Sequence, residues 1–320
     1  MSRDFKIFLI VLISCSFWWG ANVFAQRLGD FFYAKEALKS EQLLAQVNNY
    51  EQQLAKSRPV RIVDAEELNI TARSATSMLI KRDGEEKILF EKNIDEKLPI
   101  ASVTKLMTAL ISVQNYDLSQ IAEISQAAGE MENEYGNGNL KVSEKFSVKN
   151  LLHFLLIESN NGSALTLAEI MGENEFIDLM NIKAVELGLE NTFFVNPTGL
   201  DPEIESELTN YSTVKDIAKL AIRILKEEPS IWGITQKKEF DVYSSDGILF
   251  RKISNTNELL GIEPNLSGKT GWTPRAGGCL IVVYWAPDKS SHIVNVVLSS
   301  EDRFGDMRKM VDWLKASYEW

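Results

Sequence analysis

Residues 99–109 read PIASVTKLMTA, and this stretch says more about the fold than any other part of the chain. Ser102 and Lys105 form an S-x-x-K pattern at the start of an apolar segment that predicts a helix over 102–113. Because positions three apart share one helix face, the hydroxyl of Ser102 and the amine of Lys105 can meet. The serine would then be a nucleophile and the lysine its proton acceptor, if burial and a nearby cation lower the pKa of the lysine.

A second S-x-x-K pattern, Ser212-Thr213-Val214-Lys215, occurs in the same chain, so the pattern alone carries little weight. A serine at the start of a helix is often its N-cap, and we expect that role for Ser212. The lead-in Pro99-Ile100-Ala101 and the apolar helix that follows favour Ser102 as the nucleophile.

Two further motifs follow in order, Ser159-Asn160-Asn161 and Lys269-Thr270-Gly271. The second of these predicts an edge strand along a cleft, where Gly271 leaves room for a substrate backbone. Lys269 would be the cation that lowers the pKa of Lys105, and Lys269 and Thr270 could bind a carboxylate. Backbone N–H groups at the start of the Ser102 helix could hold a developing oxyanion.

Strand patterns lie at both ends of the main body and helix patterns lie between them. The strands are expected at 74–82, 87–91, 278–285 and 292–298, with Asp83-Gly84 as a hairpin turn. The helices are expected at 102–113, 148–171 in two pieces, 176–187, 212–225 and 302–316. This order predicts an α/β fold of the α+β kind, in which one antiparallel sheet assembles from both ends and packs against a helical cluster.

The composition excludes several classes of protein. Lys and Arg total 34 against 45 Asp and Glu, so the net charge is −11, which argues against a nucleic-acid-binding face. Two cysteines exclude a disulfide scaffold, and two histidines make a multi-histidine metal centre or a Ser-His-Asp triad improbable. No metal, nucleotide or flavin motif is present, so we expect no cofactor, no bound metal and no nucleic-acid partner.

The N-terminal residues 1–27 are expected to be a membrane anchor or a signal segment. Residues 7–25 carry no charge and as a helix would span about 28 Å, close to the thickness of a bilayer core. A signal peptide cleaved after Val23-Phe24-Ala25 and a lipoprotein signal at Cys15 are the alternatives. Each alternative exports the rest of the chain.

Residues 28–66 are expected to form a helical stalk or linker. Leu43, Val47, Tyr50 and Leu54 repeat with the 4-3-4 spacing of a short coiled-coil seam, although a solvated helix explains the same residues. The catalytic domain is expected over 67–320.

With its motifs in place, the sequence resembles the serine-type D-alanyl-D-alanine carboxypeptidases, the low-molecular-mass penicillin-binding proteins. The resemblance covers about residues 70–316. It extends beyond the three motifs to 151–169 (LLHFLLIESNNGSALTLAE), Asn196-Pro197-Thr198-Gly199-Leu200, Asn255-Thr256-Asn257 and Ala276-Gly277. It implies a β-lactamase/transpeptidase-like fold, here preceded by an N-terminal transmembrane helix and a stalk.

The resemblance also implies a role for each site residue. Ser102 would form the acyl-enzyme with Lys105 as its general base, while Ser159 relays protons and Asn161 holds the substrate or Lys105. Lys269 and Thr270 would bind the terminal carboxylate and aid protonation of the leaving amine, and Arg303 would lie near the carboxylate site. The backbone N–H groups of Ser102 and Trp272 would form the oxyanion hole. The chain departs from the family at Gly162, where many members have an acidic residue, and at the bulky Trp272.

The implied activity is a DD-carboxypeptidase that removes the terminal D-Ala from peptidoglycan stem peptides outside the cytoplasm of a bacterium. Its partners would be the stem peptide, the membrane through the N-terminal segment, and β-lactams as covalent inhibitors. A DD-endopeptidase acting on cross-links, a β-lactamase and a silent peptidoglycan-binding protein are the alternatives. A β-lactamase would need a deacylating glutamate, and the candidates in the loop 195–210 are Glu203, Glu205 and Glu207.

Overall fold

The computed structural model describes residues 18–33, 35–36, 39, 44–49, 59–135 and 140–320. The chain divides into a unit of Met1–Arg61 with Glu319–Trp320 and a compact unit of Ile62–Tyr318. In the first unit, residues 18–33 and 44–49 are helical, and the second unit is described below.

The predicted anchor and coiled-coil seam fall largely outside the described residues. Residues 7–17 of the anchor are not described, nor are Leu43, Tyr50 and Leu54 of the seam. In the part of the chain that is described, no helix is both long and apolar enough to cross a bilayer.

The compact unit is built on a five-stranded antiparallel sheet. Its strands, in spatial order, are β10 (Ser267–Thr273), β11 (Gly277–Trp285), β12 (His292–Ser300), β2 (Ser74–Ile80) and β3 (Glu86–Lys92). β12 from the end of the chain pairs with β2 from its beginning, with Val294 opposite Met78. The predicted sheet assembled from both ends is therefore confirmed, and β10, which carries the third motif, is an edge strand as expected.

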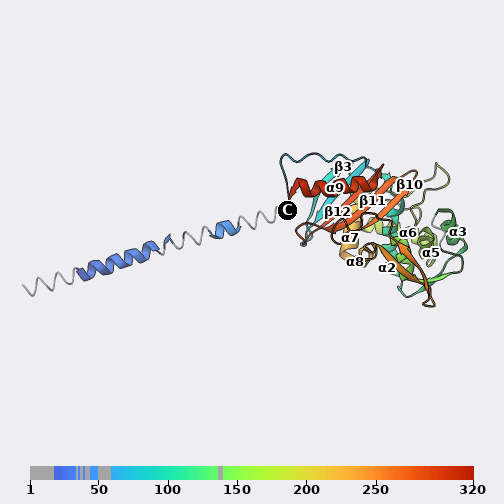
Figure 1. The fold of residues 1–320 in the computed structure, drawn as a ribbon, viewed down its shortest axis with the longest axis horizontal. Coiled ribbons are helices and arrows are strands. Elements are labelled where there is room, and N and C mark those ends of the chain that lie inside the picture. Colours follow the sequence, from blue (N-terminus) through green and yellow to red (C-terminus); the bar gives the residue numbers. More distant parts are fainter. Residues whose placement is uncertain (1–17, 34, 37–38, 40–43, 50–58, 136–139) are drawn as a thin grey trace, which may run out of the picture. The chain divides into compact units, whose positions relative to one another are not determined.

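Both faces of this sheet are covered. Helix α7 (Val214–Glu227) packs on β2 and β12, and helix α9 (Arg303–Ser317) packs on β11 and β12. In Figure 1 the strands lie between α9 and the helices α7 and α8. Val294 and Val296 of β12 belong to the hydrophobic cluster that the sheet shares with the helices. The alternate residues Ile293 and Val297 are also buried but do not belong to that cluster. Because side chains alternate across a strand, a sheet covered on both faces needs such a continuous apolar run.

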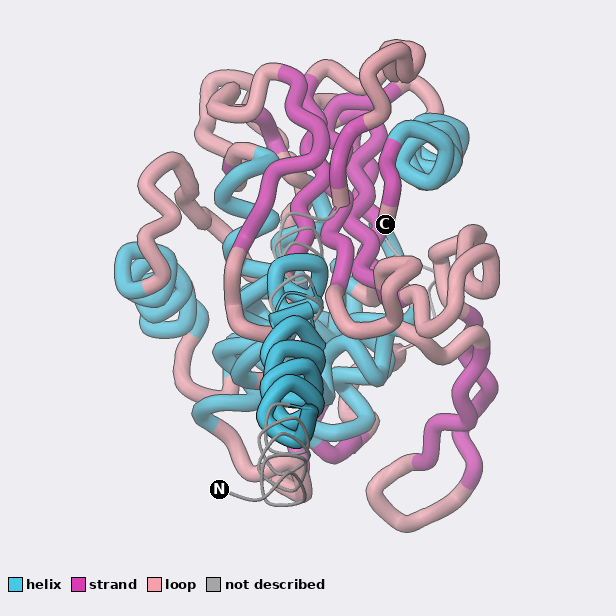
Figure 2. Tube along the Cα trace, turned by 90° about the vertical axis from the view of Figure 1, so that its left-hand side faces the viewer, coloured by secondary structure: helices cyan, strands magenta, loops and turns pink. Residues whose placement is uncertain are grey.

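The helical cluster fills the middle of the sequence, and Figure 2 shows most strands of the compact unit in its upper part with helices below. Its members are α2 (Lys105–Asn115), α3 (Gln126–Tyr135), α4 (Val148–Ile157), α5 (Asn161–Glu169), α6 (Glu173–Glu186) and α8 (Pro229–Thr235). The predicted break within 148–171 is confirmed. It falls between α4 and α5, where Asn160 caps α5 by accepting a hydrogen bond from the Ser163 N–H at 2.7 Å.

Short paired strands complete the unit. β4 (Leu98–Pro99) pairs with β7 (Tyr211–Ser212), β5 (Ile121–Glu123) with β6 (Lys145–Ser147), and β8 (Glu239–Tyr243) with β9 (Leu249–Ser254). Two further two-residue strands do not belong wholly to this unit: β1 (Val60–Arg61) is part of the first unit, and β13 (Tyr318–Glu319) has one residue in each. Strands of two or three residues are too short to show alternation, which explains why the sequence did not predict most of them.

The predicted helix over 102–113 begins differently from the prediction. Ala101–Thr104 forms the 3₁₀ turn η1, and the α-helix α2 starts at Lys105. Ile100 is at the N-cap of η1 and makes no side-chain cap bond, so Ser102 is not consumed as a cap. Its hydroxyl is left available for chemistry.

Candidate active site

The first motif forms a tight cluster around a fully buried amine. Lys105 Nζ lies 2.8 Å from Ser102 Oγ, 2.8 Å from Asn161 Oδ1 and 2.7 Å from the Thr198 carbonyl oxygen. Lys105 is fully buried, whereas Ser102 is half-buried. The structure thus brings together the serine, the lysine and the asparagine that the sequence predicted.

The three neighbours of Lys105 decide where its lone pair points. Two of them, the Asn161 amide oxygen and the Thr198 carbonyl, are pure acceptors and must receive N–H donors. Ser102 Oγ is the only one of the three that can donate. When Lys105 is neutral, its lone pair therefore faces the Ser102 hydroxyl proton.

Burial makes that neutral form accessible. Desolvation lowers the pKa of Lys105 to about 7, and the carboxylate of Glu132 acts in the opposite direction. The predicted lowering of this pKa is supported and is due to burial, whereas Lys269, the cation predicted to contribute, is not among its causes.

Glu132 was missed by the sequence reasoning. It lies on α3, is fully buried, and its Oε2 accepts a hydrogen bond from the Gly162 N–H at 3.2 Å. Gly162 packs closely on α3, because a Cβ there would lie 2.7 Å from the Ala128 carbonyl oxygen. A carboxylate in a predominantly polar stretch 30 residues before Gly162 carries no signal that links it to the site.

The second and third motifs face each other. Ser159 adopts a left-handed backbone with φ of 63°, and its Oγ accepts a hydrogen bond from Lys269 Nζ at 2.8 Å. Burial lowers the pKa of Lys269 well below its ordinary value, and the nearby charges of Lys105 and then Arg303 lower it further. The two lysines therefore share one buried site, as the sequence predicted.

Strand β10 runs directly alongside the turn that carries Ser102. A Cβ at Gly271 would lie 3.1 Å from the Ser102 amide nitrogen and 3.1 Å from the Ile100 carbonyl oxygen. Arg303 Nη1 donates to the Gly271 carbonyl at 3.2 Å, and Thr270 Oγ1 lies 2.6 Å from Thr256 Oγ1. A side chain at 271 would require this turn to move by a few tenths of an ångström, so the glycine favours the close approach.

A pocket of about 280 Å³ joins these parts. Of the nine predicted site residues, seven line it and the other two, Lys105 and Lys269, lie buried within hydrogen-bonding distance of Ser102 and Ser159. Trp272 is on its rim with 62% of its surface exposed. The lining also includes residues without a predicted role: Glu132, Glu158, Asn160, Leu200 and Thr256.

The loop Asn196-Pro197-Thr198-Gly199-Leu200 supports the floor of the site. Its Thr198 carbonyl receives Lys105, and its Pro197 carbonyl accepts a hydrogen bond from Thr108 Oγ1 at 2.6 Å. Gly199 has φ of +82°, and a Cβ there would lie 1.9 Å from the Ala101 carbonyl oxygen. The sequence resemblance identified this loop, but a backbone carbonyl has no side-chain signature that would reveal its role.

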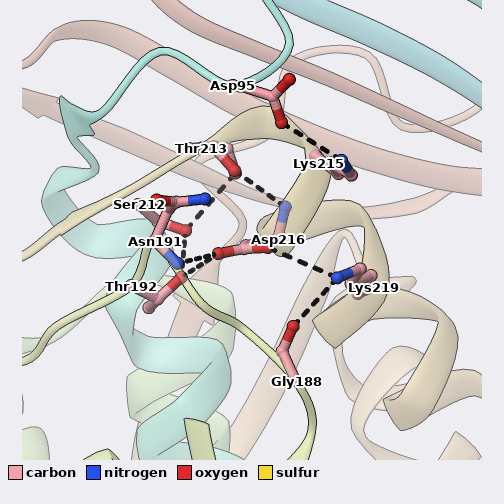
Figure 3. A network of polar contacts seen from close by, with 9 residues as sticks. All are labelled: Asp95, Gly188, Asn191, Thr192, Ser212, Thr213, Lys215, Asp216 and Lys219. Atoms are coloured by element: carbon pink, nitrogen blue, oxygen red, sulfur yellow. Dashed lines mark hydrogen bonds and ion pairs between the residues drawn. The ribbon is translucent and has the colours of Figure 1, made fainter. Parts of the chain in front are cut away.

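The second S-x-x-K pattern is structural, and its predicted cap was wrong by one residue (Figure 3). Thr213, not Ser212, caps α7, because Thr213 Oγ1 accepts from the Asp216 N–H at 3.1 Å. Ser212 lies in β7, where its Oγ is 2.7 Å from Thr192 Oγ1. Lys215 points to Asp95 at 3.2 Å instead of to Ser212.

The glutamates considered for a β-lactamase do not reach the pocket. Glu203, Glu205 and Glu207 are exposed, and none of them lines it. Arg275 stabilises the loop that contains these glutamates by donating hydrogen bonds to the carbonyls of Glu207 and Ile204.

Comparisons with known proteins identify the family of the chain. The family model described as D-alanyl-D-alanine carboxypeptidase matches residues 62–302. The D-alanyl-D-alanine carboxypeptidase DacF of Bacillus subtilis is 35% identical over 263 residues, 79% of this chain and 64% of that protein. A D-alanyl-D-alanine endopeptidase of Escherichia coli is 31% identical over 237 residues, 72% of this chain and 73% of that protein.

A solved structure shows the same fold. Penicillin-binding protein D2 from Listeria monocytogenes, in its ampicillin-bound form, is 29% identical with a TM-score of 0.65, over 78% of this chain and 99% of that one. The expected α/β transpeptidase-like fold, an antiparallel sheet with a helical cluster, is therefore confirmed. This chain belongs to the D-alanyl-D-alanine carboxypeptidase family of serine peptidases.

Proposed function

We propose that the protein is a serine-type DD-carboxypeptidase that removes the terminal D-Ala from peptidoglycan stem peptides. The observation that carries the proposal is the 2.8 Å contact between Ser102 Oγ and a fully buried Lys105 whose pKa is lowered to about 7. A lysine in this state accepts a proton near neutral pH, which an exposed lysine cannot do. The activity is assigned to the domain predicted over 67–320, which contains every site residue.

In the acylation step, Lys105 Nζ takes the hydroxyl proton as Ser102 Oγ attacks the carbonyl carbon of the penultimate D-Ala. The backbone N–H groups of Ser102 and Trp272 would stabilise the tetrahedral oxyanion. The close approach of Gly271 to the Ser102 nitrogen supports this pairing, because it places β10 beside η1.

The intermediate then collapses to an ester on Ser102 and breaks the peptide bond. The departing D-Ala nitrogen needs a proton. Lys269 would supply this proton through Ser159 Oγ, which lies 2.8 Å from Lys269 Nζ. The proton that Lys105 took from Ser102 would then pass through Ser159 Oγ to Lys269, so that both lysines return to their starting protonation states. A water molecule finally hydrolyses the ester and regenerates the serine.

The carboxylate of the substrate is proposed to bind between Lys269, Thr270 and Arg303. A carboxylate beside Lys269 favours the charged form of this lysine and so opposes the effect of burial on its pKa. A β-lactam would enter the same way and acylate Ser102, since its carboxylate and its carbonyl occupy similar positions. The name of the ampicillin-bound relative supports this reading.

A DD-endopeptidase acting on cross-links is the second candidate. It is favoured by the relatives named as endopeptidases, at 34% identity in Pseudomonas aeruginosa and 31% in Escherichia coli. The two activities are separated by incubating the protein with a pentapeptide stem and, separately, with a cross-linked dimer. Cleavage of the dimer without release of D-alanine from the pentapeptide would replace the first proposal by the second.

We also propose that the N-terminal segment anchors the catalytic domain to the outside of a bacterial membrane. The support is the uncharged run of residues 7–25. Mass spectrometry of the mature N-terminus tests this proposal. A protein that begins at Gln26 would instead be a secreted or periplasmic enzyme.

The proposed function is tested by D-alanine release from a pentapeptide stem. Wild type should release D-alanine, and Ser102→Ala should release none above background. Release by Ser102→Ala at the wild-type rate would show that the nucleophile is a different residue.

A further inference from the structure

The second motif lies in a short turn that needs external support. Glu158 ends α4 with φ of −96°, and Ser159 then takes the left-handed φ of 63° before α5 begins. A side-chain-bearing residue in this conformation is strained and persists only where its surroundings hold it. The position of Ser159 Oγ therefore depends on what fixes the turn.

An ion pair from a distant hairpin holds this turn. Arg251 on β9 donates from Nη1 to Glu158 Oε2 at 2.8 Å and from Nη2 to Glu158 Oε1. The two side chains are 22% and 6% exposed, so solvent screens the pair little. Two parallel bonds fix the orientation of a carboxylate as well as its distance.

Two aromatic rings hold the guanidinium in place. Its carbon lies 5.1 Å from the ring centre of Phe154 on α4 and 5.9 Å from that of Phe250 on β9. Such cation–π contacts restrict the rotamers of a long side chain. Arg251 is thus itself positioned before it positions Glu158.

The chain just after β9 reaches both walls of the pocket. The Thr256 N–H donates to the Ile157 carbonyl at 3.0 Å, and Thr256 Oγ1 lies 2.6 Å from Thr270 Oγ1. The segment that follows the hairpin therefore contacts the last residue of α4, which leads into the Ser159 turn, and the strand that carries Thr270. Ser159, Thr256 and Thr270 all line the pocket.

We propose that Arg251 is a positioning residue of the reaction, which acts through Glu158 to hold Ser159 Oγ against Lys269. This inference rests on the proposed function. Arg251 itself does not line the pocket, whereas Glu158 and Ser159 do. Its role is to keep the proton path aligned, so its loss lowers the rate of the chemical step more than the affinity for the ligand.

The test compares Arg251→Met, Arg251→Lys and the double variant Arg251→Met/Glu158→Gln with wild type. The matched control is Lys252→Met, which removes the neighbouring exposed pair with Glu239 on the same hairpin. Each protein is assayed for the rate constant of penicillin acylation, the dissociation constant of the complex that precedes it, and its melting temperature.

Arg251→Met and the double variant should acylate about 10- to 100-fold more slowly, with the dissociation constant changed less than about threefold. Arg251→Lys, which keeps the charge but not the two-bond geometry, should be intermediate. The double variant should melt closer to wild type than Arg251→Met, because it leaves no uncompensated carboxylate. Lys252→Met should stay within about twofold of wild type.

Two results would overturn the inference. One is a double variant that acylates at the wild-type rate, since the pair would then serve stability alone. The other is an Arg251→Met protein that loses affinity while its acylation rate constant is unchanged. A wild-type protein that neither binds penicillin covalently nor releases D-alanine would overturn the proposed function itself, and that outcome is distinct from both.

Discussion

At the scale of single residues, the protonation of Lys105 sets the pH dependence of the site. Lys105 is a proton acceptor only when neutral, so activity should rise with pH through its pKa of about 7. The carboxylate of Glu132 raises that pKa. Glu132→Gln should therefore lower the pKa of Lys105 and move the acidic limb of the penicillin acylation profile to lower pH.

The control for this prediction is Glu130→Gln, an exposed residue on the same helix. Its profile should coincide with that of wild type. An acidic limb that stays in place or moves to higher pH in Glu132→Gln would contradict the electrostatic role of Glu132.

Two glycines separate the effect of backbone strain from that of crowding. Gly188 and Gly199 both have positive φ, at +65° and +82°. A Cβ added at Gly188 would meet no atom within 4 Å, whereas a Cβ added at Gly199 would lie 1.9 Å from the Ala101 carbonyl oxygen. Gly188→Ala should cost about 1 kcal/mol in denaturant unfolding and leave acylation intact. Gly199→Ala should cost about 3 kcal/mol or more and abolish acylation, because it displaces the turn beside Ser102.

Equal losses of stability in these two variants would mean that the close approach of Gly199 to Ala101 does not matter. Full acylation by Gly199→Ala would contradict the role given to the loop 196–200 in holding Lys105.

At the scale of elements, the two S-x-x-K patterns illustrate what a local pattern can predict. Both precede a helix, but only Ser102 is in a 3₁₀ turn that directs its hydroxyl toward a buried lysine. Thr213→Ala should remove the cap of α7 and cost about 1 kcal/mol in denaturant unfolding, without changing penicillin acylation. A loss of acylation beyond the loss of folded protein would show that α7 is coupled to the site.

Most of the long elements and the reactive side chains were predictable, because periodicity and motif chemistry are local properties of the sequence. Helix α3, with ten residues, was not among the expected helices. The partners that adjust the site were not. Glu158 and Arg251 are separated by 93 residues, and the contribution of Thr198 is a backbone carbonyl. Such contacts depend on tertiary packing and leave no pattern in the chain. The N-cap of α7 was misplaced by one residue because Ser212 and Thr213 are adjacent and both can cap.

At the scale of the whole molecule, the net charge opposes the approach of an anionic ligand. The chain carries a charge of −11, and the local cations at the site are Lys269 and Arg303. Raising the ionic strength screens long-range repulsion more than it screens a buried contact. The second-order rate constant for acylation by an anionic penicillin should therefore increase about two- to threefold between low and physiological salt.

A zwitterionic penicillin is the control, since its net charge is near zero and its rate should change less. A rate that falls with added salt for the anionic penicillin would mean that the field at the pocket attracts anions. In that case the positive electrostatic potential of the local cations would exceed the negative potential of the acidic surface, even at a distance from the pocket.

The proposed reaction depends on Ser102 as the nucleophile and on Lys105 as the base that activates it. The most direct measurement is the mass of the protein after incubation with penicillin, followed by digestion to locate the adduct. One penicillin should be found on the peptide that contains Ser102, and none on Ser102→Ala. An adduct on Ser102→Ala, or one located on Ser212, would contradict it.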